Sequence, residues 1–189
     1  MVNVQPSVMR MTSSDENLAR AAADGDRDAF AALLSRHYDR LFAFAFRLTG
    51  NRAEAEDLTQ DICVALPRKL VSFRGDARFS TWLYRVAVNA SHDRRRRAAS
   101  HAKASQGWGD WERNRLQTQA ESRDANDWLT QAMATLPDDL RDTVALVLGE
   151  GLSQSEAAQV LDIAEGTVAW RMSDVKKRLR EIHEKEAQQ

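Results

Sequence analysis

A chain of 189 residues carries 27 Lys and Arg against 28 Asp and Glu, a net charge of −1, and is long enough to bury the core of one ordinary domain or two small ones. Its single cysteine, Cys63, excludes an internal disulfide framework or thiolate zinc cluster, and the scattered histidines lack ligand spacing, so we expect neither metal nor cofactor. No signal peptide and no apolar stretch of membrane-spanning length is evident, which fits a cytoplasmic protein without membrane insertion.

The N-terminal part of the chain predicts a leader and two helices. Residues 1–11 have no periodicity and are expected to form a disordered leader. Ser13 and Glu16 have the S-x-x-E spacing of a capping box, which predicts a short helix after them. Apolar residues at i, i+3 and i+4 then predict a long helix over residues 29–48, ended by Gly50.

A third helix is predicted over residues 53–70. Its apolar side should be buried, whereas its other side is mainly acidic and consists of Glu54, Asp57, Gln60 and Asp61. Pro67 removes a backbone donor and crowds the preceding turn, so we expect a kink or an early end near Leu66.

The stretch 79–97 combines an apolar helical stripe with a run of four arginines. The apolar residues should face a core: Phe79, Trp82, Leu83, Val86, Ala87 and Ala90. Another face carries a polar stripe and further arginines: Arg85, Asn89, His92, Arg96, Arg94, Arg95 and Arg97. Residues 68–103 hold ten Lys and Arg against two Asp, a net charge of +8, which suits contact with phosphate. The alternative is a solvated basic end on a core helix.

Residues 98–123 lack a sustained apolar stripe and are expected to form a flexible linker between two domains. Trp108 and Trp111 are unusual in a linker and could dock onto a domain or a partner. Helical periodicity resumes at Asp124 and is interrupted by Pro137. The helix that follows should bury Leu140, Val144, Leu146, Val147 and Leu148.

The C-terminal stretch has the pattern of a helix-turn-helix. Ser153 and Glu156 form a second capping-box pattern before a short helix, and a turn over residues 161–164 leads to a second helix. The inner face of that helix is apolar, and its outer face carries Trp170, Arg171, Lys176, Lys177, Arg178 and Arg180. A plain helical hairpin is the alternative, and the sequence shows no arrangement of catalytic residues.

These residues resemble the extracytoplasmic-function (group IV) sigma factors of bacterial RNA polymerase. The stretches DAFAALLSRHYDRLFAFAFRLTG, AEDLTQDI and FRGDARFSTWLYRVAVN, with the arginine run, are similar to their sigma-2 domain. The stretch LPDDLRDTVALVLGEGLSQSEAAQVLDIAEGTVAWRMSDVKKRLRE is similar to their sigma-4 domain. The resemblance implies an all-α fold of two small helical domains, at residues 12–97 and 124–189, joined by the linker.

The resemblance also implies partners and a function. It implies a non-enzymatic specificity subunit that joins core RNA polymerase through the β′ clamp helices and the β flap, recognises promoter DNA and serves a stress- or signal-responsive regulon. Core contact is implied for Asp57, Gln60 and Asp61. A cognate anti-sigma factor is a further expected partner, because most such proteins are held inactive by one.

Two sets of DNA contacts follow from the same resemblance. Minus-ten strand binding and capture of a flipped base are implied for Phe73, Arg74, Arg78, Trp82, Arg85, Asn89, His92, Arg94, Arg95, Arg96 and Arg97. Since Trp82 also falls on the apolar stripe, it could instead be a core residue. Minus-thirty-five recognition is implied for Gly166, Thr167, Ala169, Trp170, Arg171, Ser173, Asp174, Lys176 and Lys177.

The helix-turn-helix stretch departs from the family pattern at four positions. Family members usually have Lys or Arg at the position of Ala169, a small polar residue at Trp170, often Gly at Asp162, and a Ser or Thr cap at Ala164. Two other classes of protein stay open from the residues alone: a helix-turn-helix regulator that binds duplex operators without joining polymerase, and a helical adaptor with no DNA role.

Overall fold

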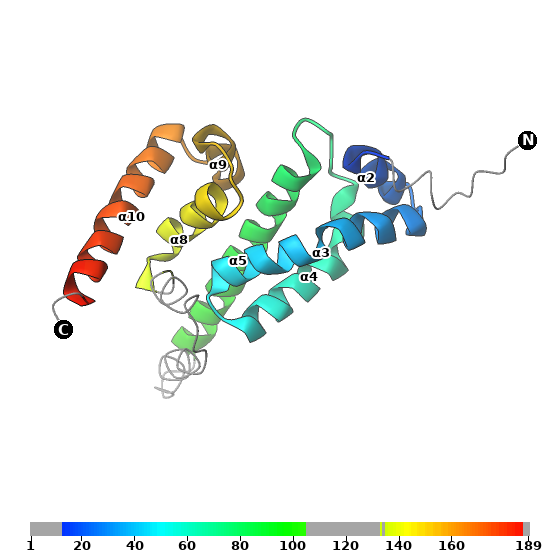
Figure 1. The fold of residues 1–189 in the computed structure, drawn as a ribbon. Coiled ribbons are helices and arrows are strands. Elements are labelled where there is room, and N and C mark those ends of the chain that lie inside the picture. Colours follow the sequence, from blue (N-terminus) through cyan, green and yellow to red (C-terminus); the bar gives the residue numbers. More distant parts are fainter. Residues whose placement is uncertain (1–12, 105–132, 134, 187–189) are drawn as a thin grey trace, which may run out of the picture.

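The computed structural model describes residues 13–104, 133 and 135–186, and every regular element in these ranges is a helix (Figure 1). The elements are α2 (Asp15–Ala23), α3 (Arg27–Thr49), α4 (Arg52–Leu70), α5 (Phe79–Ala104), α8 (Asp138–Val144), the π-helix η2 (Ala145–Gly149), α9 (Gln154–Leu161) and α10 (Glu165–Glu186). The predicted leader, Trp108, Trp111 and the start of the helix from Asp124 lie outside the described residues. The predicted all-α fold is confirmed.

The cap of α2 differs from the prediction. The Ser14 hydroxyl accepts the backbone N–H of Asn17 at 3.3 Å and forms the N-cap. The capping box expected between Ser13 and Glu16 is therefore wrong. The Glu16 carboxylate instead accepts the backbone N–H of Phe79 at 3.3 Å, so it ties α2 to the first turn of α5.

Helices α3 and α4 form where the apolar pattern predicted them. Asp26 and Asn51 cap their N-termini, and Gly50 ends α3 in the left-handed region with a φ of 68°. Helix α4 continues through Pro67 to Leu70, so the early end does not occur. Pro67 is exposed and lies in the last turn, and it removes only its own hydrogen bond to the carbonyl four residues back.

Helix α5 is buried over a wider arc than its apolar stripe predicted. The stripe is buried or half-buried along its length, and Tyr84 and Val88 beside it are only 3% and 1% exposed. The reason is that α3, α4 and α9 all pack against this helix. Helix α5 also runs past Arg97 to Ala104, into the segment expected to be a linker.

The chain after Pro137 changes from α-helical to π-helical hydrogen bonding at Ala145. Leu146 is fully buried, but Leu148 is 65% exposed, so its predicted burial is wrong. Because π-helical hydrogen bonds run from residue i to i+5, the side chains after Val144 turn out of the α-helical phase on which the prediction relied.

The predicted helix-turn-helix is present. The N–H of Glu156 donates to Ser153 Oγ at 3.1 Å, and the N–H of Ser153 donates to Glu156 Oε2 at 2.9 Å, which completes the capping box. Asp162 ends α9 in the left-handed region with a φ of 55°, a conformation that glycine adopts more easily. The inner face of α10 is buried as predicted at Val168, Met172 and Val175.

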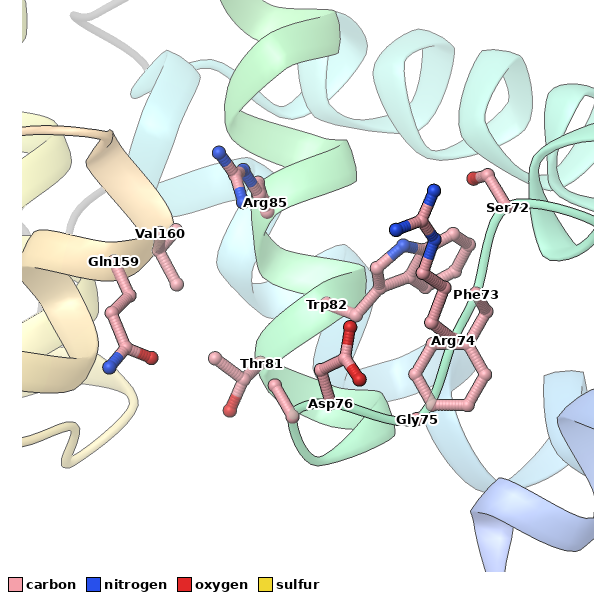
Figure 2. Close-up of a pocket in the computed structure, with 11 residues that line it drawn as sticks. Ser72, Phe73, Arg74, Gly75, Asp76, Thr81, Trp82, Arg85, Gln159 and Val160 are labelled. Atoms are coloured by element: carbon pink, nitrogen blue, oxygen red, sulfur yellow. The ribbon is translucent and has the colours of Figure 1, made fainter.

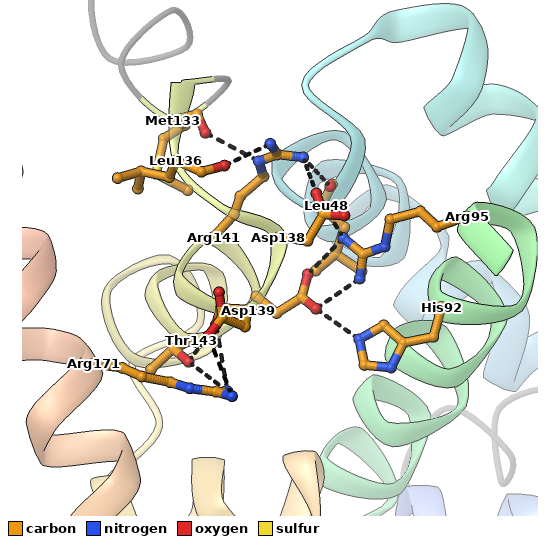
Figure 3. A network of polar contacts seen from close by, with 11 residues as sticks. Leu48, His92, Arg95, Met133, Leu136, Asp138, Asp139, Arg141, Thr143 and Arg171 are labelled. Carbon is orange, nitrogen blue, oxygen red and sulfur yellow. Dashed lines mark hydrogen bonds and ion pairs between the residues drawn. The ribbon is translucent and has the colours of Figure 1, made fainter. Parts of the chain in front are cut away.

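The second group of helices packs directly on the first. Helices α8 and α9 lie between α5 and α10 (Figure 1). Arg141, 4% exposed, donates from Nε to the carbonyl of Met133 at 3.0 Å and from Nη2 to that of Leu136 at 2.8 Å (Figure 3). Its Nη1 lies 3.4 Å from the carbonyl of Leu48, so this buried guanidinium joins α8 to the last turn of α3.

Candidate nucleic-acid and polymerase interface

A pocket of about 340 Å³ lies where the loop of residues 71–78 meets the first turns of α5 (Figure 2). Four residues of the predicted minus-ten set line it: Phe73, Arg74, Trp82 and Arg85. Helix α9 supplies the opposite side through Gln159 and Val160. The pocket therefore combines aromatic and cationic groups of one domain with a wall from the other.

Three aromatic rings fix the loop to α5. The centroid of Phe73 lies 5.7 Å from that of Phe79 and 5.4 Å from that of Trp82, and the Phe79 and Trp82 rings are 5.7 Å apart. Phe73 and Phe79 are 9% and 1% exposed, so they belong to the core, whereas Trp82 is half-buried. Trp82 thus has one side in this cluster and one side at the pocket, which fits both interpretations of its role.

The basic face of α5 contacts acidic side chains of the second domain. Arg95 Nη2 and His92 Nε2 each lie 2.7 Å from Oδ2 of Asp142, and Arg95 Nη1 is 3.4 Å from Oδ1 of Asp138 (Figure 3). Nearer the pocket, Arg85 is 3.8 Å from Asp162. All four residues of the predicted stripe are exposed, and the side chains of Arg85 and His92 are 51% and 50% exposed despite these contacts. Three other predicted minus-ten residues are exposed too: Arg74, Arg78 and Arg97.

The acidic face of α4 is exposed, as predicted. The side chains of Asp57 and Asp61 are 67% and 61% exposed, and Gln60 is exposed between them. Arg94 of α5 reaches across to this face, with Nη1 2.6 Å from Asp61 Oδ2 and Nη2 3.4 Å from Asp57 Oδ2. Val64, 80% exposed, lies one turn further along. A predicted DNA-binding residue is therefore paired with two predicted polymerase-binding residues.

Most of the predicted reading residues on α10 are exposed, with Trp170 at 63%. The exposed members are Gly166, Ala169, Trp170, Ser173, Lys176 and Lys177, while Thr167 and Asp174 are half-buried. Arg171 points inward: its side chain is 17% exposed, and its Nη2 is 3.4 Å from Asp139 Oδ2 (Figure 3). Arg171 therefore packs on α8.

A buried carboxylate that the sequence did not single out lies between the two domains. The Glu150 side chain is 2% exposed and accepts hydrogen bonds from Arg40 Nε at 2.7 Å, from Arg47 Nη1 at 2.6 Å and from the Tyr84 hydroxyl. Burial raises the pKa of Tyr84, and its hydrogen bond to Glu150 adds to the rise. No periodic pattern marks Glu150, because it lies in a short loop between two glycines.

Family models match two segments of the chain: Sigma-70 region 2 at residues 33–101 and Sigma-70, region 4 at residues 126–179. The ECF RNA polymerase sigma factor SigM of Mycobacterium tuberculosis is 38% identical over 171 residues, covering 90% of this chain and 85% of the relative. The chain belongs to the ECF RNA polymerase sigma factors. A further relative of this sigma factor, SigW of Bacillus subtilis, is 29% identical over 167 residues, with 82% of this chain and 89% of the relative covered.

Two solved structures share the fold of this sigma factor. CnrH, in complex with the cytosolic domain of CnrY, matches with a TM-score of 0.65 and 29% identity over 91% of this chain and 98% of CnrH. RpoE of Bartonella quintana, in complex with the anti-sigma factor NepR, matches with a TM-score of 0.68 and 26% identity over 82% of this chain and 96% of RpoE. The predicted family is confirmed. Neither an operator-binding regulator nor a helical adaptor would match both sigma-70 regions.

Two structural observations bear on other kinds of site in this sigma factor. Across residues 13–104 and 135–186, no helix combines the length and the hydropathy needed to cross a bilayer. The same ranges contain no grouping of three or more His, Cys, Asp or Glu side chains suited to a metal ion.

Proposed function

We propose that this sigma factor uses three surfaces to direct core RNA polymerase to promoters: the acidic face of α4, the pocket and basic face of α5, and the outer face of α10. We further propose domain boundaries at residues 12–97 and 124–189 and a role without catalysis. The observation that carries the proposal is that one chain presents an exposed acidic helix, a basic helix beside an aromatic pocket, and a helix-turn-helix.

The acidic face of α4 is the proposed polymerase-binding surface. Asp57, Gln60 and Asp61 are exposed on the two turns that precede the exposed Val64, so polar and acidic groups adjoin an apolar side chain. Protein interfaces commonly combine apolar contacts with polar groups beside them. The carboxylates suit basic side chains of a partner helix, and the β′ clamp helices are the proposed partner, with the β flap as partner of the second domain.

The pocket and the basic face of α5 are the proposed site for the minus-ten strand. A single strand is bound by base stacking on aromatic rings, worth about 1–3 kcal/mol per base, together with a basic groove for its phosphates. At the pocket, Trp82 supplies an aromatic ring for stacking and Arg74 supplies a cation for a phosphate. The arginines of residues 94–97 extend the basic groove. A flipped base needs such a pocket to offset its lost stacking.

The outer face of α10 is the proposed reader of the minus-thirty-five duplex. Helix-turn-helix proteins place the N-terminal residues of the second helix at base edges in the major groove. Ala169, Trp170 and Ser173 are exposed there, and Lys176 and Lys177 are exposed further along, within reach of phosphates. Arg171 supports this helix from its inner side.

Sequestration by an anti-sigma factor and a cytoplasmic location are also proposed. Of the two structural neighbours, CnrH is bound to the cytosolic domain of CnrY and RpoE to the anti-sigma factor NepR. A protein that binds both polymerase and promoter DNA must meet them in the same compartment, which in bacteria is the cytoplasm.

Co-purification with core RNA polymerase tests the polymerase-binding surface. Asp57→Arg combined with Gln60→Ala should abolish binding, because the reversal places a cation against a basic partner surface. Asp39→Arg on the exposed surface of α3 is the matched control and should bind as the unsubstituted chain does. Equal recovery of polymerase with both variants would rule out this role for α4.

A further inference from the structure

The outer face of α10 carries a large aromatic ring near its N-terminal end, where helix-turn-helix proteins read base edges. We propose that Trp170 selects the sequence of the minus-thirty-five duplex by contact with the C5 methyl group of thymine, and not by hydrogen bonds to guanine. The inference deepens the proposed function: it rests on the reading role of α10 and adds the base that this helix selects.

The indole of Trp170 stands above its surroundings on α10. Its residue is 63% exposed, and the three neighbours on the same surface, Gly166, Ala169 and Ser173, are small and exposed. A Cβ atom added to Gly166, one turn before Trp170, would meet no atom within 4 Å, so the indole does not fold back onto that turn. The ring is therefore open to a groove of DNA laid along this face.

Arg171 is the only cation in the N-terminal half of α10, residues 165–175, all of which the structure describes. Its side chain is 17% exposed, with Nη2 3.4 Å from Asp139 Oδ2 and Nη1 3.5 Å from Thr143 Oγ1 (Figure 3). The commonest specific contact to guanine is a forked pair of hydrogen bonds from arginine or lysine to O6 and N7. Because Arg171 is turned toward α8, this half of the helix presents no such group.

The exposed cations of α10 come later in the helix. Lys176 and Lys177 are exposed beyond the reading positions, and Arg178 donates from Nε to Asp174 Oδ2 at 3.0 Å. This pair balances the charge of Asp174 within the helix, so the carboxylate does not face phosphate alone. Contacts to phosphate position a protein on the duplex without reading its sequence. The selection of bases therefore falls to the N-terminal half.

Thymine is the base whose major-groove edge suits this surface. Its C5 methyl is an apolar group on an edge that otherwise carries hydrogen-bond donors and acceptors. The Trp170 ring and the Ala169 methyl offer apolar surface, and burial of a methyl group against them is favourable. The polar edge of guanine would instead lose water against the ring without gaining a partner for each acceptor. The surface thus favours thymine over guanine.

Removal of the methyl group from DNA tests the contact directly. The full chain, assembled with core RNA polymerase, selects duplexes from a pool that is randomised over a short stretch. The selected duplex is then remade with deoxyuridine in place of one thymine at a time, a change that removes the methyl and keeps the O4 acceptor. At the thymine that Trp170 contacts, fluorescence anisotropy should show binding weakened about 3- to 5-fold.

Two variants of Trp170 assign the effect to this side chain. Trp170→Ser removes the ring, so it should bind the thymine and deoxyuridine duplexes equally. Trp170→Phe is the matched control, because it keeps an aromatic ring without the indole N–H and should retain the preference for thymine. Since the site is largely exposed, thermal melting should be the same for all three chains.

The outcomes distinguish this inference from the reading role of α10. Equal binding of thymine and deoxyuridine duplexes by the unsubstituted chain would overturn the methyl contact while α10 remains the reader. A preference that survives in Trp170→Ser would overturn Trp170 as its source, and a preference lost in Trp170→Phe would assign it to the indole N–H instead. Selection of no common sequence by any chain would refute duplex reading by α10, and the inference with it.

Discussion

The guanidinium of Arg95 meets the carboxylate of Asp142 with two parallel hydrogen bonds, from Nη2 to Oδ2 at 2.7 Å and from Nη1 to Oδ1 at 3.3 Å. Asp142 is almost fully buried, whereas the Arg95 side chain is 26% exposed. This forked geometry is the strong form of a charged pair, and here it joins residues that are 47 positions apart in the chain. The pair therefore bears directly on how firmly the two domains are docked.

A double-mutant cycle between these two residues should give a large coupling energy. We expect the Arg95→Gln and Asp142→Asn substitutions to be coupled by about 1–3 kcal/mol in the free energy of urea unfolding, because each leaves a charged partner without its fork. The exposed pair Arg52 and Glu56, at 2.9 Å, is the matched control and should couple by about 0.3–0.5 kcal/mol. Equal coupling in both cycles would contradict the role of the interdomain pair.

Substitutions of two cations on α10 should distinguish a residue that stabilises the helix from one that contacts DNA. Arg171→Ala is expected to lower the free energy of unfolding by about 1 kcal/mol, because it removes the contacts with Asp139 and Thr143. Lys177→Ala should leave stability unchanged and lower the slope of log affinity for duplex DNA against log salt by about 1. Fluorescence anisotropy at several salt concentrations measures the slope, and thermal melting measures stability. The reverse pattern would show that Arg171 is the phosphate contact.

Replacing the arginines at residues 94–97 by serine should weaken single-strand binding and flatten its salt dependence. Each lost phosphate contact on a single strand lowers the slope by about 0.7. Serine at Arg20 and Arg27 is the control for loss of charge elsewhere on the first domain. An unchanged slope would count against the basic groove.

The contacts of Asp15 predict a pH-dependent contribution to stability. Burial acts to raise the pKa of Asp15, but hydrogen bonds from Arg36 and His37, both at 2.7 Å, lower it overall below the usual value for an aspartate. A carboxyl group whose pKa is depressed in the folded state stabilises the fold above its unfolded pKa and loses that contribution as pH falls through the folded value. Asp15→Asn should therefore cost about 0.5–1 kcal/mol at neutral pH, and less in acid. Thermal melting of the unsubstituted chain and of the Asp15→Asn variant at neutral and at acid pH measures this. A difference in melting temperature that is the same at both pH values would exclude the effect.

The sequence predicted the helices well because each one depends on a local repeat. The apolar spacing placed α3 and α4, and the Ser153 capping box and the turn at Asp162 placed the helix-turn-helix. The errors were also local. Ser14 rather than its neighbour caps α2, and the π-helical turn rotates Leu148 out to solvent. The spacing of apolar residues in an α-helix reveals neither the identity of the N-cap residue nor a π-helical turn.

The contacts between the domains were not predicted, because they have no local signature. Arg40 lies 110 residues from Glu150, and His92 lies 50 residues from Asp142. In the sequence these acidic residues resemble solvated charges at helix ends and loops. Only the packing of α8 and η2 on α3 and of α9 on α5 removes water from them, and that packing follows from tertiary structure. Periodicity therefore located the DNA-facing stripe without showing what covers it.

Gly149 of the second domain lies directly against the side chain of Arg47 of the first. A Cβ atom at this position would lie 2.7 Å from Cδ and 3.0 Å from Nε of Arg47, so any larger residue would push aside the side chain that holds Glu150. The Arg47 side chain can occupy its position because residue 149 has no Cβ atom, and this steric condition does not depend on charge. In related chains, the size of this one residue would change how closely the two domains pack, even where the sequence keeps the same charged residues.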